Sequence, residues 1–576
     1  MIFKFNELKK IGHVIGYEFK VKFILLIILL IFSAFLEMLG ISLIPMIISV
    51  VLDFDNFVKI ASTFLNNFGL TSSLVVEKLN IKIFLISILI FFVIKNLIML
   101  AIFYFEGKLE YKIKQSISNR LFNIYIRSSY ENFHLKRKSS ELIRNLAIEV
   151  ANLSSYLNAI INLIREISVF LFLIALLLFV NFKLTFSVLM FFSIIIGIYY
   201  LLLAKKIKNS GKEYIILKEK IISRISQTIF SIKELFIYEK ETLVQNKFSE
   251  DIKNYEIKIF FLNFIKKVPR IILEVSGVGL IILFILFFSK TQNNIDMIAI
   301  ASLVGLCAIR MIPSLNTMSN SVINIKFYKT SFDIIFNELS HKLSTNKKVN
   351  IISNNNIKQK NGEIFDTIEF KNVCYSYDDK KIIFDNFNFN VKRGEFVKII
   401  GNSGKGKSTF LNLLTGLLQP KFGSIRLKSD NKFFESKNLK NLFSYVPQET
   451  FIFDQSIKEN ILFGNIEKKE FLKKCIEKAN LNEFLINLPD GIETNCGERG
   501  KNLSGGQKQK IAIARALYAN RDILLFDEIT SNLDSNNEEK IIKTINKFKG
   551  SKTVIFITHK NIDSLKYDKL LDFNEI

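Results

Sequence analysis

The chain has few of the residues that mark disulfide-rich, zinc-binding or fibrous proteins. Its 576 residues include only 4 Cys, 6 Pro and 24 Gly. No two cysteines form a CxxC pair, so the sequence predicts neither a disulfide framework nor a zinc site. The low proline and glycine content excludes a collagen-like repeat and a proline-rich linker protein. We therefore expect a folded chain with reduced, structural cysteines.

Hydrophobic and basic residues are abundant. Hydrophobic residues make up 49% of the chain, 56 residues are Phe, and the mean hydropathy is +0.27. Lysine and arginine outnumber aspartate and glutamate by 78 to 53, which gives a formal net charge of +25. Such an excess is typical of proteins that bind nucleic acid or that face a membrane surface. The long apolar runs favour the membrane and argue against a nucleic-acid partner.

Six apolar runs are long enough to cross a membrane once flanking helix is included. The first is too long for the core of a signal peptide, so we expect a retained span. Basic residues concentrate in two polar segments, 106–145 and 205–258. By the positive-inside rule, both segments and both termini are expected in the cytoplasm. The predicted spans lie within residues 23–52, 83–105, 167–180, 184–204, 271–289 and 297–309.

The sequence pattern changes after about residue 316. Short β-branched runs at 395–401, 522–527 and 553–558 alternate with helical patterns. This alternation is typical of a parallel sheet covered by helices. We expect an α-helical transmembrane domain at 1–340, a polar, Asn-rich linker at 341–364 and an α/β domain at 365–576.

A phosphate-binding motif opens the α/β domain. The segment GNSGKGKST follows a predicted strand and precedes an apolar helical run, which is the context that a P-loop requires. Its glycines let backbone N–H groups close around phosphate oxygens, and the N-terminus of the next helix adds the positive end of its dipole. Lys407 is predicted to reach the β- and γ-phosphates of a nucleotide, and Ser408 to coordinate Mg²⁺. The predicted nucleotide-binding residues are Gly401, Asn402, Ser403, Gly404, Lys405, Gly406, Lys407, Ser408 and Thr409.

A pair of carboxylates ends a second predicted strand, ILLFDE at 523–528. Asp527 is placed to hold Mg²⁺, and Glu528 to orient and deprotonate the attacking water. One carboxylate for the metal and one for the water is the minimum that hydrolysis of a nucleotide requires.

The pentapeptide LSGGQ at 503–507 resembles the signature of ATP-binding cassette (ABC) proteins, and further motifs follow in the order of that family. The resemblance implies that Tyr377 stacks on adenine, that Gln448 contacts Mg²⁺ and the membrane domain, and that His559 touches the γ-phosphate. The chain has DEITSNLD and THK where the family usually has DEATSALD and AHR. Neither change removes a phosphate-, metal- or water-handling group. The resemblance adds to the predicted ATP contacts Ser504, Gly505, Gly506, Gln507 and the D-loop residue Asp534.

Six spans ahead of one cassette resemble half of a type IV ABC exporter. The resemblance implies a dimer in which the signature of one chain closes on ATP held by the other. Because this chain has both a P-loop and an intact signature, we expect a homodimer with two hydrolytic sites, and a heterodimer with a related subunit is the alternative. Coupling helices are expected near 130–135 and 228–235.

The membrane region also resembles the lipid-linked oligosaccharide flippases of bacterial N-glycosylation. This suggests an inner-membrane, ATP-driven flippase for a polyprenyl-pyrophosphate oligosaccharide, with a general exporter of lipids, drugs or peptides as the alternative. Lys95, Arg270 and Arg310 are cations in or beside apolar spans, where charge is costly. We expect them to attract the pyrophosphate, or instead to pair internally, with Arg270 on Glu274 and Arg310 or Lys95 on Glu37. An amphipathic segment at 57–70 is expected to lie at the membrane interface.

Overall fold

The computed structural model describes residues 5–52, 81–131, 137–180, 182–288, 294–345, 365–377, 382–429, 432–435, 441–530, 535–560 and 562–575. The chain forms two compact units. Unit 1 contains Met1–Ser128 and Asn132–Ile351, and unit 2 contains Ser129–Glu131 and Ile352–Ile576. The interfacial segment predicted at 57–70 and most of the coupling segment predicted at 130–135 lie outside the described residues.

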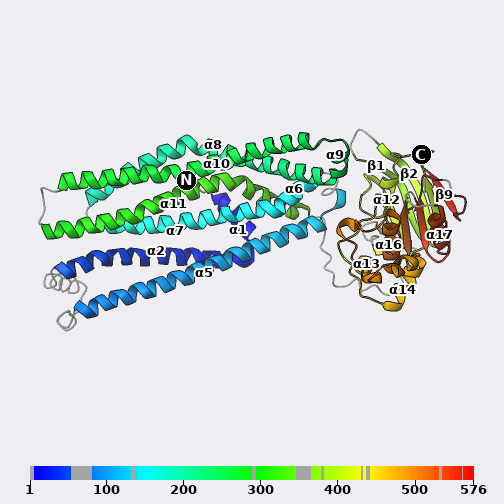
Figure 1. The fold of residues 1–576 in the computed structure, drawn as a ribbon, viewed down its shortest axis with the longest axis horizontal. Coiled ribbons are helices and arrows are strands. Elements are labelled where there is room, and N and C mark those ends of the chain that lie inside the picture. Colours follow the sequence, from blue (N-terminus) through cyan, green and yellow to red (C-terminus); the bar gives the residue numbers. More distant parts are fainter. Residues whose placement is uncertain are drawn as a thin grey trace. The chain divides into compact units, whose positions relative to one another are not determined.

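Unit 1 is helical, and the described residues of each predicted apolar run fall within one long helix (Figure 1). Among the described residues, three stretches are long and apolar enough to cross a membrane: Tyr17–Ile44, Lys82–Arg127 and Ser139–Leu178. The helices are α1 (Phe5–Ile15), α2 (Tyr17–Leu52), α5 (Ile81–Arg127), α6 (Ser139–Arg144), the π turn η2 (Asn145–Glu149), α7 (Val150–Val180), α8 (Phe182–Phe230), α9 (Ile232–Ile237), α10 (Glu241–Phe288) and α11 (Asn294–Thr345).

The long helices continue past their apolar runs as amphipathic helices. In α5 the buried residues recur every fourth position, at Leu109, Ile113, Ile117 and Leu121. This spacing puts them in one stripe on the helix surface, which packs in a cluster with α1, α2, α7 and α11. Burial of this stripe therefore orders helix beyond the predicted span.

The short helix α1 is fixed to α5 by a charged contact at its C-terminal end. The Arg120 guanidinium donates to the carbonyl oxygens of Val14, at 2.8 Å, and His13, at 3.4 Å. These carbonyls belong to the last turn of α1, where a helix leaves acceptors without helical partners and carries partial negative charge. Arg120 therefore satisfies the end of one helix from the side of another.

Unit 2 is an α/β unit with two sheets, in agreement with the predicted fold class. The first is antiparallel in the order β2-β1-β4-β5, from β1 (Thr367–Ser376), β2 (Ile382–Lys392), β4 (Phe422–Ser429) and β5 (Lys432–Glu435). The second is parallel in the order β6-β7-β8-β3-β9, from β3 (Phe396–Ile400), β6 (Phe443–Val446), β7 (Ile523–Asp527), β8 (Thr553–Ile557) and β9 (Lys569–Asp572). The predicted strands at 395–401, 522–527 and 553–558 are β3, β7 and β8.

Helices pack on these sheets (Figure 1), and the three central strands β7, β8 and β3 of the parallel sheet are buried almost throughout. Val554 to Ile557 in β8 are all at most 1% exposed, which is typical of a strand covered on both faces. The helices are α12 (Lys407–Leu414), α13 (Ile457–Leu462), α14 (Lys469–Lys478), α15 (Asn482–Ile486), α16 (Gly505–Tyr518) and α17 (Ser535–Asn546).

The close approach of α8 and α11 gives a test of the packing in unit 1. A Cβ atom at Gly211 would lie 2.3 Å from the Phe327 carbonyl oxygen, whereas one at Gly107 in α5 would meet nothing within 4 Å. We expect Gly211→Ala to lower stability by about 1–3 kcal/mol, because the helices must separate. Gly107→Ala is the matched control and should be neutral or stabilising, since alanine favours helix. Thermal unfolding in detergent checks both, and an equal effect of the two substitutions would contradict the crossing geometry.

Candidate functional site

The predicted P-loop joins β3 to α12 and takes the backbone conformation that its glycines permit. Gly401 has a φ of +148°, and Gly406 has a φ of +104°. A Cβ atom at Gly401 would lie 2.7 Å from the Cβ of Phe573, and one at Gly406 would lie 2.9 Å from Ile383. Only glycine fits both positions, because a side chain would be strained and would also clash. Asn402, Ser403, Gly404, Lys405 and Ser408 are exposed around this loop, and Thr409 is buried.

The side chains of three predicted residues, Lys407, His559 and Glu528, meet at the carboxyl edge of the parallel sheet. The Lys407 ammonium donates to the carbonyl oxygens of Gly401, at 2.7 Å, and Asn402, at 3.1 Å, and lies 3.2 Å from His559 Nε2. His559 Nε2 is 2.5 Å from Glu528 Oε1. The chain of contacts follows from strand order, because β6, β7, β8 and β3 are neighbours and run parallel.

The Glu528 carboxylate is held from two sides. Its second oxygen accepts a hydrogen bond from Gln448 Nε2 at 2.8 Å. Its backbone has a φ of +49°, which is uncommon for a residue with a side chain and often marks a functional position. Its amide N–H donates to the Ile557 carbonyl at 3.0 Å, so β8 holds this unusual conformation.

Asp527 lies beside this group and is partly buried. Tyr445, on β6, donates its hydroxyl to Asp527 Oδ2 at 3.0 Å. Burial raises the pKa of the Asp527 carboxyl above its ordinary value, the Tyr445 hydrogen bond opposes the rise, and the Glu528 charge adds to it. Burial also lowers the pKa of the Lys407 ammonium. A carboxylate and an ammonium that both lose solvation are favourable partners for a metal ion and a phosphate group.

Two residues of the site were not predicted: Tyr445, which positions Asp527, and Asn574, whose side chain accepts from the Asn402 amide N–H at 2.9 Å. Tyr445 could have been found, because it stands in the strand that leads to Gln448 and alternates with buried neighbours. Asn574 has no local signal, since it follows β9 and reaches the P-loop only through the sheet.

The remaining predicted ATP contacts lie in three places. Tyr377 is 45% exposed, and its hydroxyl is 3.2 Å from Thr409 Oγ1. Ser504 caps α16: its hydroxyl accepts from the Gln507 amide at 3.3 Å, and its own amide donates to Gln507 Oε1 at 2.8 Å. This capping box leaves the exposed helix start at Gly505 with amide groups that have no helical acceptor. Gly506 follows it in the first turn, and Asp534 lies outside the described residues.

The donor set fits Mg²⁺ and a nucleotide. Ser408, Asp527 and Gln448 offer oxygen ligands, which Mg²⁺ prefers, and the P-loop offers backbone donors shaped by Gly401 and Gly406. Within the part of the chain that the structure describes, no group of three or more His, Cys, Asp or Glu residues could hold a metal. A nucleotide site needs no such group, because Mg²⁺ is usually held by one or two carboxylates together with phosphates and water.

Two of the three cations predicted for substrate are paired within unit 1. Arg270 Nε donates to Glu274 Oε1 at 2.8 Å. Arg310, on α11, forms a two-bond contact with Glu37 on α2, with Nη2 3.1 Å from Glu37 Oε2. The structure therefore contains the internal pairing that was the alternative for these arginines. Lys95 has its ammonium 4.9 Å from the centre of the Phe92 ring.

The Arg310 contact extends to a third helix. Arg310 Nη1 donates to Ser314 Oγ at 2.9 Å, and this hydroxyl donates to Glu166 Oε2 on α7 at 2.7 Å. Arg310 Nη1 also lies 3.5 Å from the Glu166 carboxylate. One guanidinium thus joins two carboxylates, and the cluster has more formal negative than positive charge. Such a cluster is poorly suited to an added anion.

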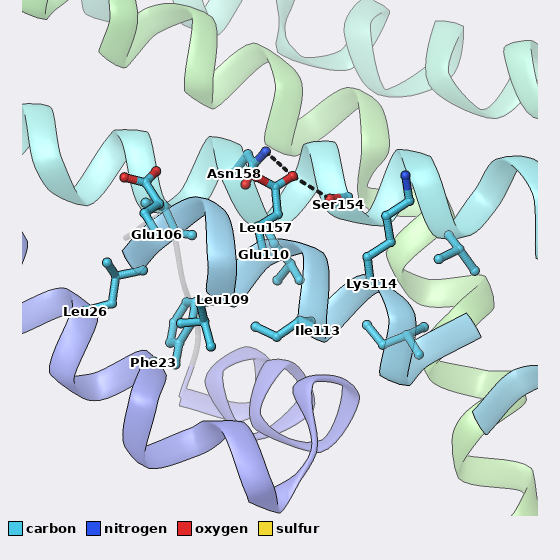
Figure 2. A pocket seen from close by; sticks show the side chains of 13 residues that line it. Phe23, Leu26, Glu106, Leu109, Glu110, Ile113, Lys114, Ser154, Leu157 and Asn158 are labelled. Carbon is cyan, nitrogen blue, oxygen red and sulfur yellow. Dashed lines mark hydrogen bonds between the residues drawn. The ribbon is translucent and has the colours of Figure 1, made fainter. Parts of the chain in front are cut away.

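A small cavity lies between α2, α5 and α7 (Figure 2). Figure 2 shows Phe23, Leu26 and Leu109 on its apolar side. On the polar side, Glu110 accepts hydrogen bonds from Ser154 Oγ at 2.8 Å and Asn158 Nδ2 at 2.7 Å. Glu106 and Lys114 also line the cavity, so two carboxylates face it against one ammonium, which disfavours a pyrophosphate.

Comparisons with known proteins agree with the two-unit architecture. The model of the ABC transporter transmembrane region matches residues 23–304, and the ABC transporter model matches residues 384–531. A putative export ATP-binding/permease protein of Rickettsia prowazekii is 28% identical over 483 residues, 81% of this chain and 81% of the relative. An ATP-dependent lipid A-core flippase of Wigglesworthia glossinidia brevipalpis is 28% identical over 484 residues, 81% of this chain and 79% of the relative.

Two further similarities involve Atm1 proteins. The mitochondrial iron-sulfur clusters transporter ATM1 of Candida glabrata is 38% identical over 212 residues, which are 36% of this chain and 29% of that relative. A solved structure of a bacterial Atm1-family ABC exporter with ATP bound has a TM-score of 0.71 at 20% identity, and the match covers 96% of this chain and 93% of that one. At this identity the structural likeness shows the fold alone.

The raised pKa of Asp527 makes a prediction about stability and pH. Because the pKa of the Asp527 carboxyl is higher in the folded protein than in the unfolded chain, the carboxyl ionises at a lower pH in the unfolded chain. At neutral pH this group therefore lowers the stability of the folded state. We expect Asp527→Asn to raise the thermal midpoint of nucleotide-free protein at neutral pH. The advantage should vanish at a pH below the ordinary range of aspartate, where the carboxyl is protonated in both states. A pH series of thermal unfolding in EDTA checks this, and an advantage independent of pH would contradict it.

The Glu37–Arg310 contact makes a prediction that separates a structural role from a substrate role. Arg310→Met leaves the Glu37 carboxylate unpaired, so we expect a loss of about 3–5 kcal/mol in stability. Adding Glu37→Gln should restore part of that loss, because no uncompensated charge then remains at that position. Thermal unfolding in detergent measures both variants. Unchanged stability of Arg310→Met, together with lost transport, would instead identify a substrate contact.

Proposed function

The chain belongs to the ABC exporters as a half-transporter, with a transmembrane region and an ATP-binding unit on one polypeptide, and from this premise we propose that two identical copies form one ATP-driven exporter. Its ATP-binding unit makes it an ATP hydrolase, and the hydrolysis is coupled to transport. The observation that carries the proposal is the contact chain from Lys407 through His559 and Glu528 to Gln448.

Each residue at the edge of the parallel sheet has one role in this proposal. The P-loop amides and Lys407 hold the β- and γ-phosphates, which replace the Gly401 and Asn402 carbonyls as partners of the ammonium. Ser408, Gln448 and Asp527 would hold Mg²⁺, which would supply positive charge beside the phosphates. Tyr445 keeps Asp527 in place through its hydroxyl.

Glu528 is the general base of the proposed site. One oxygen accepts a hydrogen bond from Gln448 and the other lies 2.5 Å from His559, and each oxygen keeps a further lone pair that can accept a proton from water. Gln448 would also offer its side-chain oxygen to Mg²⁺, and His559 would lie near the γ-phosphate of bound ATP.

The proposed dimer completes each site from the other chain. Ser504 and Gly505 are exposed, and the capping box at Ser504 fixes the start of α16 with its amide dipoles directed outward. In the dimer this helix start, with Asp534, would contact ATP held by the partner copy. Helix α9 includes part of the predicted coupling segment at 228–235, and its Phe236 and Ile237 are 61% and 67% exposed. We assign α9 the coupling role.

For the cargo we propose an amphiphilic lipid at an inner membrane, with a polyprenyl-pyrophosphate oligosaccharide as the narrower candidate. Similarity to a lipid A-core flippase supports the wider class. Arg270 pairs with Glu274, and Arg310 pairs with Glu37. Of the three predicted cations, Lys95 is therefore the best candidate to bind a pyrophosphate. The general exporter of lipids, drugs or peptides is therefore the competing proposal.

The substitution Glu528→Gln tests the proposed chemistry. It keeps the hydrogen-bonding shape but removes the base, so we expect ATP hydrolysis to fall by roughly 10²–10⁴-fold. Binding of a fluorescent ATP analogue should persist, and ATP should convert purified protein to a tightly closed dimer measured by cross-linking. Monomeric protein with bound ATP, or retained hydrolysis, would overturn the proposal.

Reconstitution in vesicles tests the cargo. Wild-type protein should move a fluorescent amphiphilic lipid in an ATP-dependent way, and Glu528→Gln is the matched inactive control. Movement of polyprenyl-pyrophosphate oligosaccharide would support the narrower candidate. ATPase stimulated by apolar drugs and unaffected by either lipid would support the competing one.

A further inference from the structure

One continuous helix runs through α6, η2 and α7 and contains a single π turn. The Val150 amide donates to the Asn145 carbonyl, five residues back, which defines the π register. Arg144 has φ −55° and ψ −48°, and Val150 has φ −65° and ψ −37°, so the helix passes through the turn without a break. The π-helix is rare and appears mostly as a single turn inside an α-helix, frequently at a functional site.

A buried ion pair favours this register. Arg144 Nε lies 3.6 Å from Glu149 Oε1, and the side chains are 6% and 0% exposed. The two residues are five apart, whereas an α-helix brings side chains together at a spacing of three or four. The wider π turn is what lets them face each other. Asn152 adds a hydrogen bond to Glu149 Oε2 at 3.2 Å, so the carboxylate is fixed from the following turn as well.

Neighbouring helices also contact this turn. Arg144 pairs with Glu219 on α8, and its Nη2 donates to Asn145 Oδ1 at 3.0 Å. Asn145 Nδ2 in turn donates to the Tyr125 hydroxyl on α5 at 3.1 Å. Arg144 and Asn145 are 5% and 0% exposed. A change in the register of the turn would therefore change contacts with both α5 and α8.

We propose that Asn145–Glu149 is a two-register element, and that Arg144 is the positioning residue that selects its register during the ATP cycle. In the α register Arg144 would face Ala147 and Ile148 and lose Glu149, while the backbone would gain ordinary hydrogen bonds. A shift of one residue rotates α6 against α7 by about 100° and moves it about 1.5 Å along the axis.

The chain connectivity gives this rotation a route to the ATP-binding unit. α6 begins at Ser139, shortly after Ser129–Glu131, which groups with unit 2. The inference rests on the proposed function, because the turn would transmit the effect of ATP to the transmembrane helices. It goes beyond that function by naming where in the chain the two states differ.

Hydrogen exchange read by mass spectrometry tests the inference on the full chain with Glu528→Gln as the parent. Addition of ATP and Mg²⁺ should change the exchange of amides 144–150, because their acceptors move from five to four residues back. Exchange that stays the same while a fluorescent ATP analogue binds would overturn the two-register element alone. A parent that binds no ATP would overturn the proposed function and this inference with it.

Deletion of Ala147 is the sharpest variant. It shortens the turn by one residue, so an ordinary α-helix then places Arg144 and Glu149 four apart and keeps their pair. We expect ATP binding to persist and the ATP-dependent change in exchange to be lost. A deletion variant that still shows the full change would overturn the proposal.

Substitutions provide a second test if the deletion variant does not fold. Glu149→Gln removes the charge that favours the π register, so the exchange pattern of the ATP state should appear without ATP. Arg144→Met should do the same. The matched control is Arg137→Met, which breaks a 2.5 Å pair with Glu338 in the same unit and should leave the ATP-dependent change intact. An equal effect of the control and Glu149→Gln would reduce the turn to a structural feature and overturn the proposal.

Discussion

The chemistry of unit 2 depends on parallel pairing of four adjacent strands, β6, β7, β8 and β3. Parallel strands end at the same edge, so groups that are far apart in the sequence arrive there together. Lys407 and His559 are separated by 152 positions, yet lie within 3.2 Å. The buried strands fix the backbone at this edge, and the side chains of Lys407, His559, Glu528 and Gln448 contact one another there. A rigid sheet with adaptable side chains at its end is well suited to recognise whether a nucleotide is present.

In unit 1 the corresponding constraint is the cost of charge away from water. The arginines near apolar spans are met by carboxylates, as Arg310 is by Glu37 and Glu166, and Arg165 is by Glu106. These contacts link α2, α5, α7 and α11 by bonds that have direction, within surfaces that otherwise pack by shape. Polar contacts of this kind define how helices pair more strictly than leucine and isoleucine do. They also show why a charged residue in a span cannot be taken alone as a substrate contact.

Much of the fold and of the ATP site could be predicted because the signals are local. The P-loop needs glycine at fixed positions, and apolar runs mark the spans and the strands β3, β7 and β8. The helices extend beyond the apolar runs, and the sequence did not predict this extension. Buried stripes such as Leu109 to Leu121 become apparent only when the helices that pack against them are known. The pairing of Arg310 with Glu37 was one of two predicted alternatives, the other being contact with substrate. The additional contact of Arg310 with Glu166 was not predicted. The position of Asn574 beside the P-loop and the π turn at Asn145–Glu149 depend on contacts between distant segments, which spacing alone does not encode.

The attachment of α1 through Arg120 has a practical consequence for work with this protein. A purification tag or fluorescent protein fused upstream of Phe5 would be joined to a helix whose far end is tied to α5. Its orientation would then report on the part of the helix bundle around Arg120. Removing the first helix to simplify crystallisation would leave a guanidinium without its two carbonyl acceptors, beside a newly uncovered apolar surface formed by partners of Ile11 and Val14.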